Sequence, residues 1–347
     1  MIVAAIVGGT LALAACGSAT PSSGTGSGGR AKALVGAGST LVAPLMSVWQ
    51  PTYYKRYGVA ITYGAIGSGG GIVQLIARTV DFGASDAPFL RAQAAACHGC
   101  LEIPWALAAT LVAYHLKGAP NHLRFSGRVL ADIWLGRIRR WDDPAIRRLN
   151  PHVKLPDTAI LPVHRVDGSG DTYAFVDYLD RVSPRFRAEI GPPAPIVNWP
   201  GGVGGRGNSG VGGVLSAANG TIAYIAIAYV LQSHFDYGLV ENQAGRFPTP
   251  GIPSIAAAAD ALRSVPAGGR RGVSIVDPPA SAPDAYPIST FTYVLVPTAT
   301  RPGIAPTLRR FISWAVTAGQ RFGPKLDFAP LPQAVVRADL ADVRLIR

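Results

Sequence analysis

A short apolar segment that runs into a Gly/Ser turn and then into a helical segment occurs repeatedly along this chain. Residues 32–40 (KALVGAGST) precede a stretch, 41–57, whose apolar side chains fall at helical spacing. The same order recurs over 59–80, and again over 159–182. Alternation of short strands with helices of this kind is typical of layered α/β proteins. The repetition therefore predicts an α/β fold.

Later segments extend the same pattern. Residues 141–151 predict a short helix with Asp143 as its N-cap and Pro144 at its first position. The longest apolar run after the N-terminus, 104–116, predicts a buried strand near a crossover between domains. The other expected elements are buried strands over 220–230 and 289–298 and an amphipathic helix over 305–322.

Length and charge limit the possible functions. The chain has 347 residues, which is long for a single core and sufficient for two domains. Its formal net charge is +12, but the densest basic groups, 136–143 (GRIRRWDD) and 268–272 (GGRRG), are short. A nucleic-acid-binding surface usually gathers Lys and Arg into a patch or stripe. We therefore expect no nucleic-acid partner, and a basic surface that favours the approach of anions.

The N-terminus has the features of a lipoprotein signal. Residues 1–15 form an apolar run of signal-peptide length, too short to span a membrane, and they end in Leu-Ala-Ala before Cys16. This sequence resembles the lipobox of bacterial lipoproteins, in which the peptide is cleaved before the cysteine and the thiol is acylated. No Lys or Arg precedes the apolar run, which departs from that pattern. Residues 16–32, rich in Gly and Ser, predict a flexible tether.

Two further cysteines, Cys97 and Cys100, lie in the short segment CHGC. In an exported chain a disulfide is the expected state of such a pair. A zinc site would need two more ligands, and only His98 is nearby. A local disulfide is therefore predicted, and no metal site.

Three of the predicted strand-to-helix turns carry Ser or Thr beside glycine: Ser39-Thr40, Ser68-Gly69 and Ser169-Gly170. Helix N-termini present unpaired N–H groups, and glycine lets a ligand approach the backbone closely. Hydroxyl residues also cap helices where no ligand binds. Three such turns in one chain, with Arg165 beside the third, favour a site for a tetrahedral oxyanion.

Other interpretations of these turns fail on spacing. A phosphate loop needs a lysine after its second glycine, and the nucleophile elbow Gly-x-Ser-x-Gly is also missing. A calcium loop counted from Asp167 would need Gly at Thr172 and Glu at Tyr178. His164 belongs to no Ser–His–Asp arrangement that the sequence reveals.

Asp86 lies between small residues at an expected strand end, in VDFGASDAP (80–88). A carboxylate near an anion repels it unless the anion carries a proton that the carboxylate can accept. Phosphate groups retain a proton near neutral pH, with a second pKa of about 6. Sulfate is fully ionised, so an unpaired carboxylate would exclude it. Asp86 is either such a proton acceptor or a cap of the turn before Pro88.

Five segments resemble, in order and spacing, the phosphate-binding proteins of bacterial phosphate ABC transporters, the PstS family. They are GAGSTLVAPLMSVW, YGAIGSGGGIVQLIARTVDFGASDAP, IWLGRIRRWDDPAIRRLNP, HRVDGSGDTYAFVDYL and YPISTFTYVLV. The resemblance covers residues 33 to 345. It implies a type II periplasmic-binding-protein fold, with two α/β lobes around a central ligand cleft. Lobe I would comprise 33–112 and 290–347, lobe II 113–289, and the chain would cross near residues 112 and 290.

The resemblance also implies a set of site residues. Thr40 and Ser68 would donate from hydroxyl and backbone groups, Asp86 would accept the proton of phosphate, and Arg165 would pair with the anion. Asp167 would orient Arg165. Some members of the family have Thr at the position of Asp171. We expect the Asp171 side chain to turn outward and cap the helix. Whether the hydroxyl of Thr172 takes the place of the Thr hydroxyl that is lost at position 171 is left open. The expected phosphate-binding residues are Ser39, Thr40, Leu41, Ser68, Asp86, Arg165, Ser169, Gly170 and Asp171.

The implied function is capture of inorganic phosphate, monobasic or dibasic, by a lipid-anchored extracytoplasmic receptor that delivers it to an ABC transporter permease. We expect a monomer that needs no cofactor and catalyses no reaction. A sulfate or molybdate receptor, a phosphate sensor without a transport role and a phosphatase-like hydrolase are the alternatives.

Overall fold

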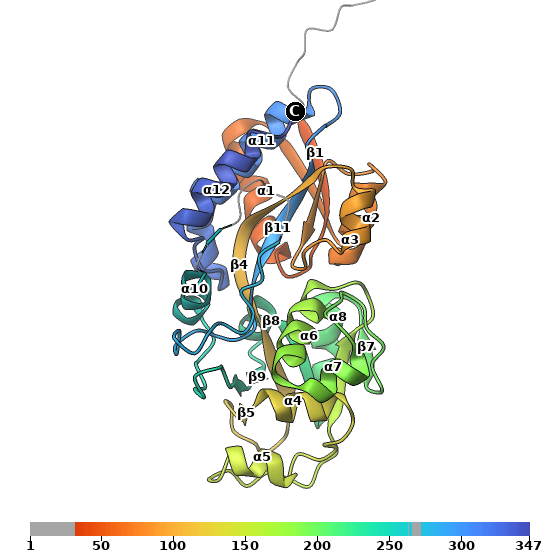
Figure 1. Ribbon diagram of the computed structural model, residues 1–347, viewed down its shortest axis with the longest axis vertical. Helices are drawn as coiled ribbons and strands as arrows, with labels where there is room; N and C mark the ends of the chain where they lie inside the picture. The colour runs from red at the N-terminus through yellow and green to blue at the C-terminus, as the bar shows by residue number, and fades with distance from the viewer. Residues whose placement is uncertain (1–31, 263, 266–271) are drawn as a thin grey trace, which may run out of the picture.

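The computed structural model describes residues 32–262, 264–265 and 272–347, and the molecule is elongated, with one half above the other in Figure 1. Within those residues, nine strands form one sheet in the order β2-β1-β3-β11-β4-β8-β6-β7, with β9 paired to β4. The strands of this sheet are β1 (Ala33–Gly38), β2 (Ala60–Ala65), β3 (Phe82–Ser85), β4 (Cys100–His115), β6 (Leu161–Arg165), β7 (Val203–Gly205), β8 (Thr221–Ala226), β9 (Asp236–Tyr237) and β11 (Ser289–Pro297). A small second sheet pairs β5 (Arg124–Phe125) with β10 (Leu239–Val240).

Strand β4 joins the two halves. Its residues Cys100–Ala109 pair with β11, and its residues Thr110–His115 pair with β8. Nearly all of its side chains are buried, as a strand covered on both faces requires. The buried strand predicted from residues 104–116 is therefore confirmed, together with the strand over 289–298.

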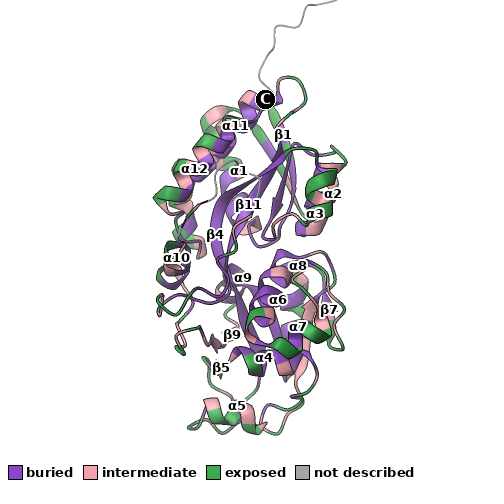
Figure 2. Cartoon of the chain, viewed as in Figure 1, coloured by how far each residue is buried: buried purple, intermediate pink, exposed green. Residues whose placement is uncertain are grey.

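Helices cover the faces of the sheet in both halves, and Figure 2 shows the sheet buried and the outer faces of the helices exposed. The upper half contains α1 (Ala43–Tyr57), α2 (Ser68–Ile76), α3 (Arg91–Ala96), α11 (Ile304–Val316), the 3-10 helix η1 (Ala318–Leu326) and α12 (Gln333–Val343). The lower half contains α4 (Gly127–Trp134), α5 (Pro144–Leu149), α6 (Gly170–Val182), α7 (Pro184–Ile190), α8 (Gly207–Ala217) and α9 (Ile227–Gln232). Helix α10 (Ile252–Asp260) packs against β4 and β11.

Aromatic side chains fill the core of each half. In the upper half Trp49 packs edge-on against Trp105 and Trp314. In the lower half Phe175 stacks on Tyr224 at a centroid distance of 4.8 Å. Aromatic pairs in these geometries stabilise a core beyond the area that they bury. Each half is thus a packed unit that holds the ends of its strands in fixed positions.

Most of the predicted elements are present. The three predicted strand–turn–helix units are β1–α1, β2–α2 and β6–α6. Helix α5 begins at Pro144, and the Asp143 carboxylate accepts a hydrogen bond from the Ala145 N–H at 2.8 Å. The predicted disulfide joins Cys97 to Cys100 between α3 and β4. The α/β fold class is confirmed.

Two predicted elements end early. The strand expected over 220–230 stops at Ala226, and α9 begins at Ile227, because an apolar run has no periodicity that separates a buried strand from a buried helix. The helix expected over 305–322 stops at Val316. The 3-10 helix η1 follows α11. Within η1, the Gly319 carbonyl accepts a hydrogen bond from the indole N–H of Trp49.

The predicted signal peptide, tether and acylated Cys16 lie outside the described residues. In the parts of the chain that the structure describes, no helix has the length and apolar character to cross a membrane.

Candidate functional site

The three predicted turns meet where the upper and lower halves face each other. The turns after β1 and β2 belong to the upper half and the turn after β6 to the lower half. Two backbone hydrogen bonds join them directly: Gly69 N–H donates to the Gly168 carbonyl at 2.9 Å, and Gly170 N–H donates to Ser68 Oγ at 3.1 Å. In α/β proteins the carboxyl ends of the strands are the usual place for a ligand.

Asp86 follows β3 at the centre of this region and is 3% exposed. Ser39 Oγ lies 2.7 and 2.6 Å from its two carboxylate oxygens, and Thr292 Oγ1 donates to Oδ1 at 2.6 Å. Ser68 Oγ lies 3.4 Å from Oδ2 and accepts the Asp86 N–H at 3.2 Å. Asp86 is therefore buried among hydroxyl donors from three strands or turns of the upper half, and it does not act only as a cap of the turn before Pro88.

Gly170 brings helix α6 against Asp86. A Cβ added at Gly170 would lie 2.4 Å from the Asp86 Cβ and 2.8 Å from its Cα. No such contact is possible in a folded protein, so only glycine allows the two halves to approach this closely here.

Arg165, the last residue of β6, is the main cation of the site and is 5% exposed. Its Nε donates to Asp167 Oδ1 at 2.8 Å and its Nη2 to Asp167 Oδ2 at 2.5 Å, which is a bidentate pair. Burial would raise the pKa of Asp167, but the hydrogen bonds and charge of Arg165, with the N–H of Gly207, lower it below its usual value. The pairing predicted between Asp167 and Arg165 is thus present.

The prediction that Asp171 turns outward is wrong. Its carboxylate is 1% exposed, and its Oδ2 accepts Arg165 Nη1 and Asn208 Nδ2, both at 2.9 Å. Its Oδ1 accepts the Thr110 hydroxyl at 2.8 Å. Donors from β6, α8 and β4 together offset part of the cost of burying this charge, and two of these elements lie far from residue 171 in sequence. Local helix capping could not compete with three such partners.

Asp86 and Asp171 both hold protons more tightly than ordinary carboxylic acids. Burial raises the pKa of Asp86 to about 7, the negative charge of Asp171 adds to this effect, and hydrogen bonds from Ser39 and Thr292 oppose it. Burial also raises the pKa of Asp171, while the positive charge of Arg165 opposes this shift. Two buried carboxylates with raised pKa values can share protons with a bound molecule, which suits them to accept hydrogen bonds from a protonated oxyanion.

The remaining predicted residues have defined partners. Leu41 N–H donates to Ser39 Oγ at 3.0 Å. Ser169 is the N-cap of α6, where its hydroxyl accepts the Thr172 N–H at 3.3 Å. The hydroxyl of Thr172 lies 2.9 Å from Tyr224 OH, so it is engaged with Tyr224 and does not replace the hydroxyl lost at Asp171.

Sequence reasoning missed three polar residues of this region. Thr110 and Thr292 lie inside buried apolar strands, where the sequence gives no sign of a polar contact. Asn208 follows the turn between β7 and α8, in GGRGNSG (204–210). That segment is a fourth strand–glycine–helix junction, and the pattern used for the other three would have found it.

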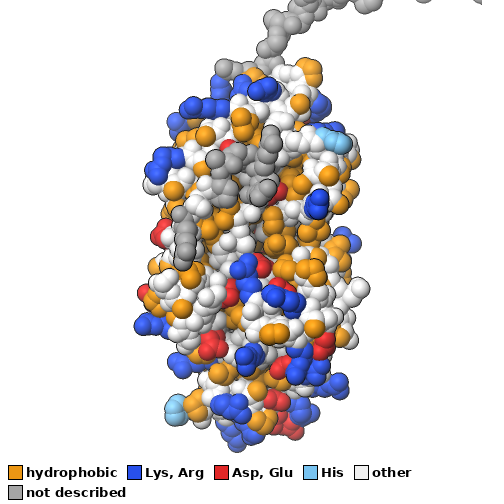
Figure 3. Space-filling model, viewed as in Figure 1, with side chains coloured by type: hydrophobic (Ala, Val, Ile, Leu, Met, Phe, Trp, Pro, Cys, Tyr) orange, Lys and Arg blue, Asp and Glu red, His pale blue; other side chains and the backbone are white. Residues whose placement is uncertain are grey.

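One side of the cleft is mostly apolar. A groove beside the three turns is lined by Ile66, Val73 and Leu90 of the upper half and by Pro195 and Ile196 of the lower half. Figure 3 shows hydrophobic side chains gathered between the two halves on this face. Apolar side chains of the two halves therefore face each other beside the polar turns.

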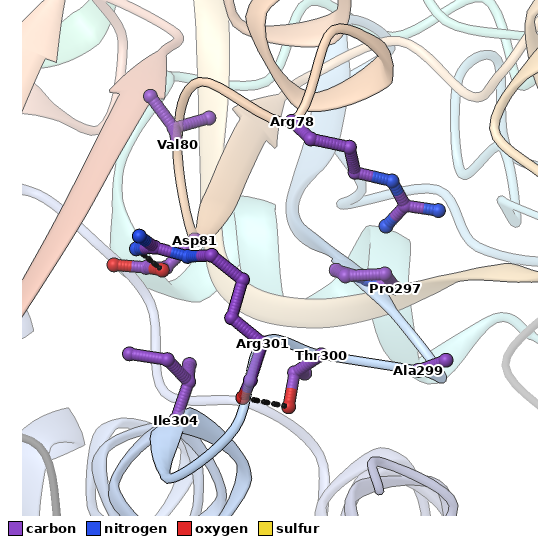
Figure 4. Close-up of a pocket in the computed structure, with 8 residues that line it drawn as sticks. All are labelled: Arg78, Val80, Asp81, Pro297, Ala299, Thr300, Arg301 and Ile304. Atoms are coloured by element: carbon purple, nitrogen blue, oxygen red, sulfur yellow. Dashed lines mark hydrogen bonds and ion pairs between the residues drawn. The ribbon is translucent and has the colours of Figure 1, made fainter.

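A separate hollow lies away from the cleft. Figure 4 shows it between Arg78–Asp81 and Pro297–Ile304, where Arg301 and Asp81 pair at 2.5 Å. None of the predicted site residues line it. Among the described residues, no group of three or more His, Cys, Asp or Glu side chains could hold a metal ion.

Comparison with known proteins identifies the family. The model of the PBP superfamily domain matches residues 20–318. The phosphate-binding protein PstS of Pasteurella multocida is 37% identical over 310 residues, which cover 89% of this chain and 89% of that protein. This chain belongs to the PstS family.

Other comparisons agree. The PstS of Haemophilus influenzae is 33% identical over 309 residues, covering 88% of this chain and 91% of the relative. A solved phosphate binding protein from Stenotrophomonas maltophilia superposes with a TM-score of 0.70 at 17% identity, covering 90% of this chain and 94% of that one. At this identity the likeness concerns the fold. The type II periplasmic-binding-protein architecture expected of a PstS family member is confirmed.

Proposed function

We propose that this protein is an extracytoplasmic receptor that captures inorganic phosphate and delivers it to the permease of an ABC transporter. Membership of the PstS family supports this function. The observation that carries the proposal is the buried carboxylate of Asp86 among hydroxyl donors, facing a helix N-terminus and a buried arginine across the cleft. Donors attract an oxyanion, and the carboxylate restricts it to one that carries a proton.

Phosphate fits this combination of groups. Monobasic phosphate carries two protons and dibasic phosphate one, so Asp86 can accept a hydrogen bond from either form. Asp171 supplies a second buried acceptor beside Arg165. Sulfate brings no proton to either carboxylate, so its binding would place the negative charge of sulfate against the negative charges of two buried carboxylates. Sulfate and molybdate are therefore the less favoured ligands.

The residues proposed to bind phosphate are those expected from the family resemblance. The upper half would contribute hydroxyl and N–H donors and the acceptor Asp86, and the lower half the arginine and the start of α6. Asp167 would hold the guanidinium in place. The proposed set is Ser39, Thr40, Leu41, Ser68, Asp86, Arg165, Ser169, Gly170 and Asp171.

Closure of two lobes would enclose the ligand. We take lobe I as 33–112 with 290–347 and lobe II as 113–289. The hydrogen bonds from Gly69 to Gly168 and from Gly170 to Ser68 join residues of different lobes, so they form only when the lobes meet. A ligand that contacts both lobes stabilises the closed arrangement by its differential affinity for it.

We further propose that the chain is a monomer attached to the membrane by a lipid on Cys16, facing the extracytoplasmic side. Residues 1–15 would be removed as a signal peptide, and 16–32 would act as the tether. The apolar run before Cys16 supports this assignment.

We also propose that no bond of the ligand is broken. The hydroxyls of Ser39 and Ser169 are bonded to a carboxylate and to a backbone N–H, respectively, and neither is bonded to a histidine that could act as a base. Incubation with a chromogenic phosphomonoester should give no turnover above the buffer rate. Turnover that is lost in a Ser39→Ala variant would support the hydrolase alternative instead.

Equilibrium dialysis of the mature protein with labelled phosphate tests the binding function. We expect saturable binding of one phosphate per chain that excess sulfate does not displace. Absence of phosphate binding, or equal displacement by sulfate, would overturn the proposal. Loss of phosphate uptake by cells that lack the receptor, restored by its expression, would distinguish transport from sensing.

A further inference from the structure

Asn208 is a buried polar residue in the cleft to which the proposed binding set gives no role. It lies at the start of α8, in the lower half, and is 1% exposed. Its side-chain oxygen accepts the N–H of Ala226 at 2.9 Å. Because a backbone N–H can only donate, this bond fixes the amide so that its NH₂ group points the other way.

The NH₂ group of Asn208 connects residues from the two halves. It donates to Thr40 Oγ1 of the upper half at 2.9 Å and to Asp171 Oδ2 of the lower half at 2.9 Å. Its backbone N–H makes a longer bond to Thr40 Oγ1, at 3.4 Å. Both amide hydrogens of Asn208 and one lone pair of its side-chain oxygen are therefore engaged, which holds the amide in one orientation.

The hydrogen bonds from Asn208 determine whether the Thr40 hydroxyl can act as a donor or as an acceptor. A hydroxyl has one hydrogen to donate and two lone pairs that accept. Two N–H groups of Asn208 point at the lone-pair side of Thr40 Oγ1, so its hydrogen must point elsewhere and is available to an acceptor. Thr40 and Asn208 line the same hollow of the cleft, together with Asp167 and Tyr229. An anion bound against Thr40 would meet its hydroxyl as a donor.

The start of α8 is fixed by the same charged network. Gly207, with a positive φ of 64°, donates its N–H to Asp167 Oδ1 at 2.9 Å, and Asp167 holds Arg165. Tyr229 of α9 adds a bond from its hydroxyl to the Thr40 carbonyl at 3.0 Å. The lower half therefore contacts Thr40 at both its side chain and its backbone when the halves are closed.

We propose that Asn208 is a positioning residue that, on closure, turns the Thr40 hydroxyl into a donor for the anion and holds Asp171 beside Arg165. Asn208 thereby couples closure of the two halves to recognition of the ligand. This inference rests on the proposed phosphate-binding function and adds a residue outside its binding set.

A double-mutant cycle with Asn208→Ala and Thr40→Val tests this coupling, with phosphate affinity measured by calorimetry. Asn208→Ala should weaken phosphate binding about tenfold, the effect of losing one well-placed hydrogen bond with its partner left buried. In the Thr40→Val background, where no hydroxyl remains to be oriented, the same change should weaken binding by a clearly smaller factor. If Asn208 acts only through packing, Asn208→Ala should weaken phosphate binding by the same factor in the wild-type and Thr40→Val backgrounds.

Two further variants control the experiment. Asn242 is also a buried Asn, but its NH₂ group donates to the carbonyls of Pro283 and Ala285, outside the cleft. Asn242→Ala should lower the melting temperature without changing phosphate affinity. Asn208→Asp keeps the shape and the acceptor for Ala226, but it replaces the donor by a carboxylate. It should weaken binding more than Asn208→Ala does.

The outcomes separate this inference from the proposed function. If the wild-type protein binds phosphate and Asn208→Ala or Asn208→Asp binds it equally well, the inference is wrong and the function stands. If Asn208→Ala lowers phosphate affinity by the same factor with and without Thr40→Val, the inference is also wrong. If the wild-type protein binds no phosphate, both fail.

Discussion

At the scale of single residues, the proposed function assigns the choice of anion to two buried carboxylates. Asp86 and Asp171 lie on opposite halves, each held by hydroxyl or amide donors. Arg165 pairs with both Asp167 and Asp171, so a single buried positive charge faces three buried carboxylates. A proton supplied by the ligand reduces this imbalance, and an anion without one increases it.

Asp86→Asn tests that role. The amide removes the negative charge and can itself donate to an anion without a proton. We expect the ratio of phosphate affinity to sulfate affinity to fall at least tenfold, since a hydrogen bond to a charged group contributes about 1.5–3 kcal/mol. Calorimetric titration with both anions measures the ratio. Asp81→Asn is the matched control, because Asp81 is also buried but pairs with Arg301 away from the cleft. An unchanged ratio in Asp86→Asn would contradict the assignment.

At the scale of secondary-structure elements, the start of α6 must approach β3 without a side chain between them. Gly170→Ala places a methyl group against the backbone of Asp86 when the halves are closed. An open form, with the proposed lobes apart, would avoid this clash. We therefore expect phosphate affinity to fall more than tenfold, because closing now costs a steric clash, while the unfolding free energy changes by less than about 1 kcal/mol.

Gly213→Ala provides the comparison for Gly170→Ala. Gly213 lies in α8 with open space around the position of its missing Cβ. Alanine there should stabilise the fold by about 0.5–1 kcal/mol and leave phosphate affinity unchanged. Equal binding by the two variants would show that α6 does not need this close approach.

Helix α12 carries a buried acid that makes stability depend on pH. Burial, with the added negative charge of Asp342, raises the pKa of Asp339 to about 9, and Asp339 is 1% exposed. The folded state then holds a proton that the unfolded state loses above about pH 4. The unfolding free energy should fall as pH rises from about 4 to 9, by up to about 1.4 kcal/mol per pH unit from this group.

Asp339→Asn should remove that contribution, because an amide does not titrate. Urea unfolding of both proteins at several values between pH 5 and 8 measures the two slopes. Identical slopes would mean that Asp339 is ionised in the folded protein across this range.

The elements and the site could be predicted from sequence to different extents. The junctions at Ser39, Ser68 and Ser169 depend on local patterns, so they could be found without a structure. The orientation of Asp171 could not, because its partners Thr110 and Asn208 are distant in sequence and come together only in the fold. The early end of β8 was missed for another reason: its apolar residues suit a strand and a helix equally.

At the scale of the whole molecule, we expect phosphate binding to change the shape of the protein. Contacts across the cleft, such as the bond from Gly170 to Ser68, join halves that are otherwise connected through β4, β11 and the neighbouring segments. Addition of phosphate should lower the radius of gyration of the wild-type protein in small-angle X-ray scattering. Gly170→Ala should show a smaller decrease at the same phosphate concentration. A wild-type radius that does not change with phosphate would contradict closure.

Calorimetric titration of the wild-type protein with phosphate and with sulfate between pH 5.5 and 8.5 tests the central claim most directly. Because the pKa of Asp86 is raised to about 7, this residue becomes ionised as pH rises through the middle of that range. Sulfate carries no proton at any of these values. We expect phosphate binding throughout this range and a preference for phosphate over sulfate that grows as pH rises. Sulfate binding at pH 8.5 with an affinity comparable to that of phosphate would contradict it.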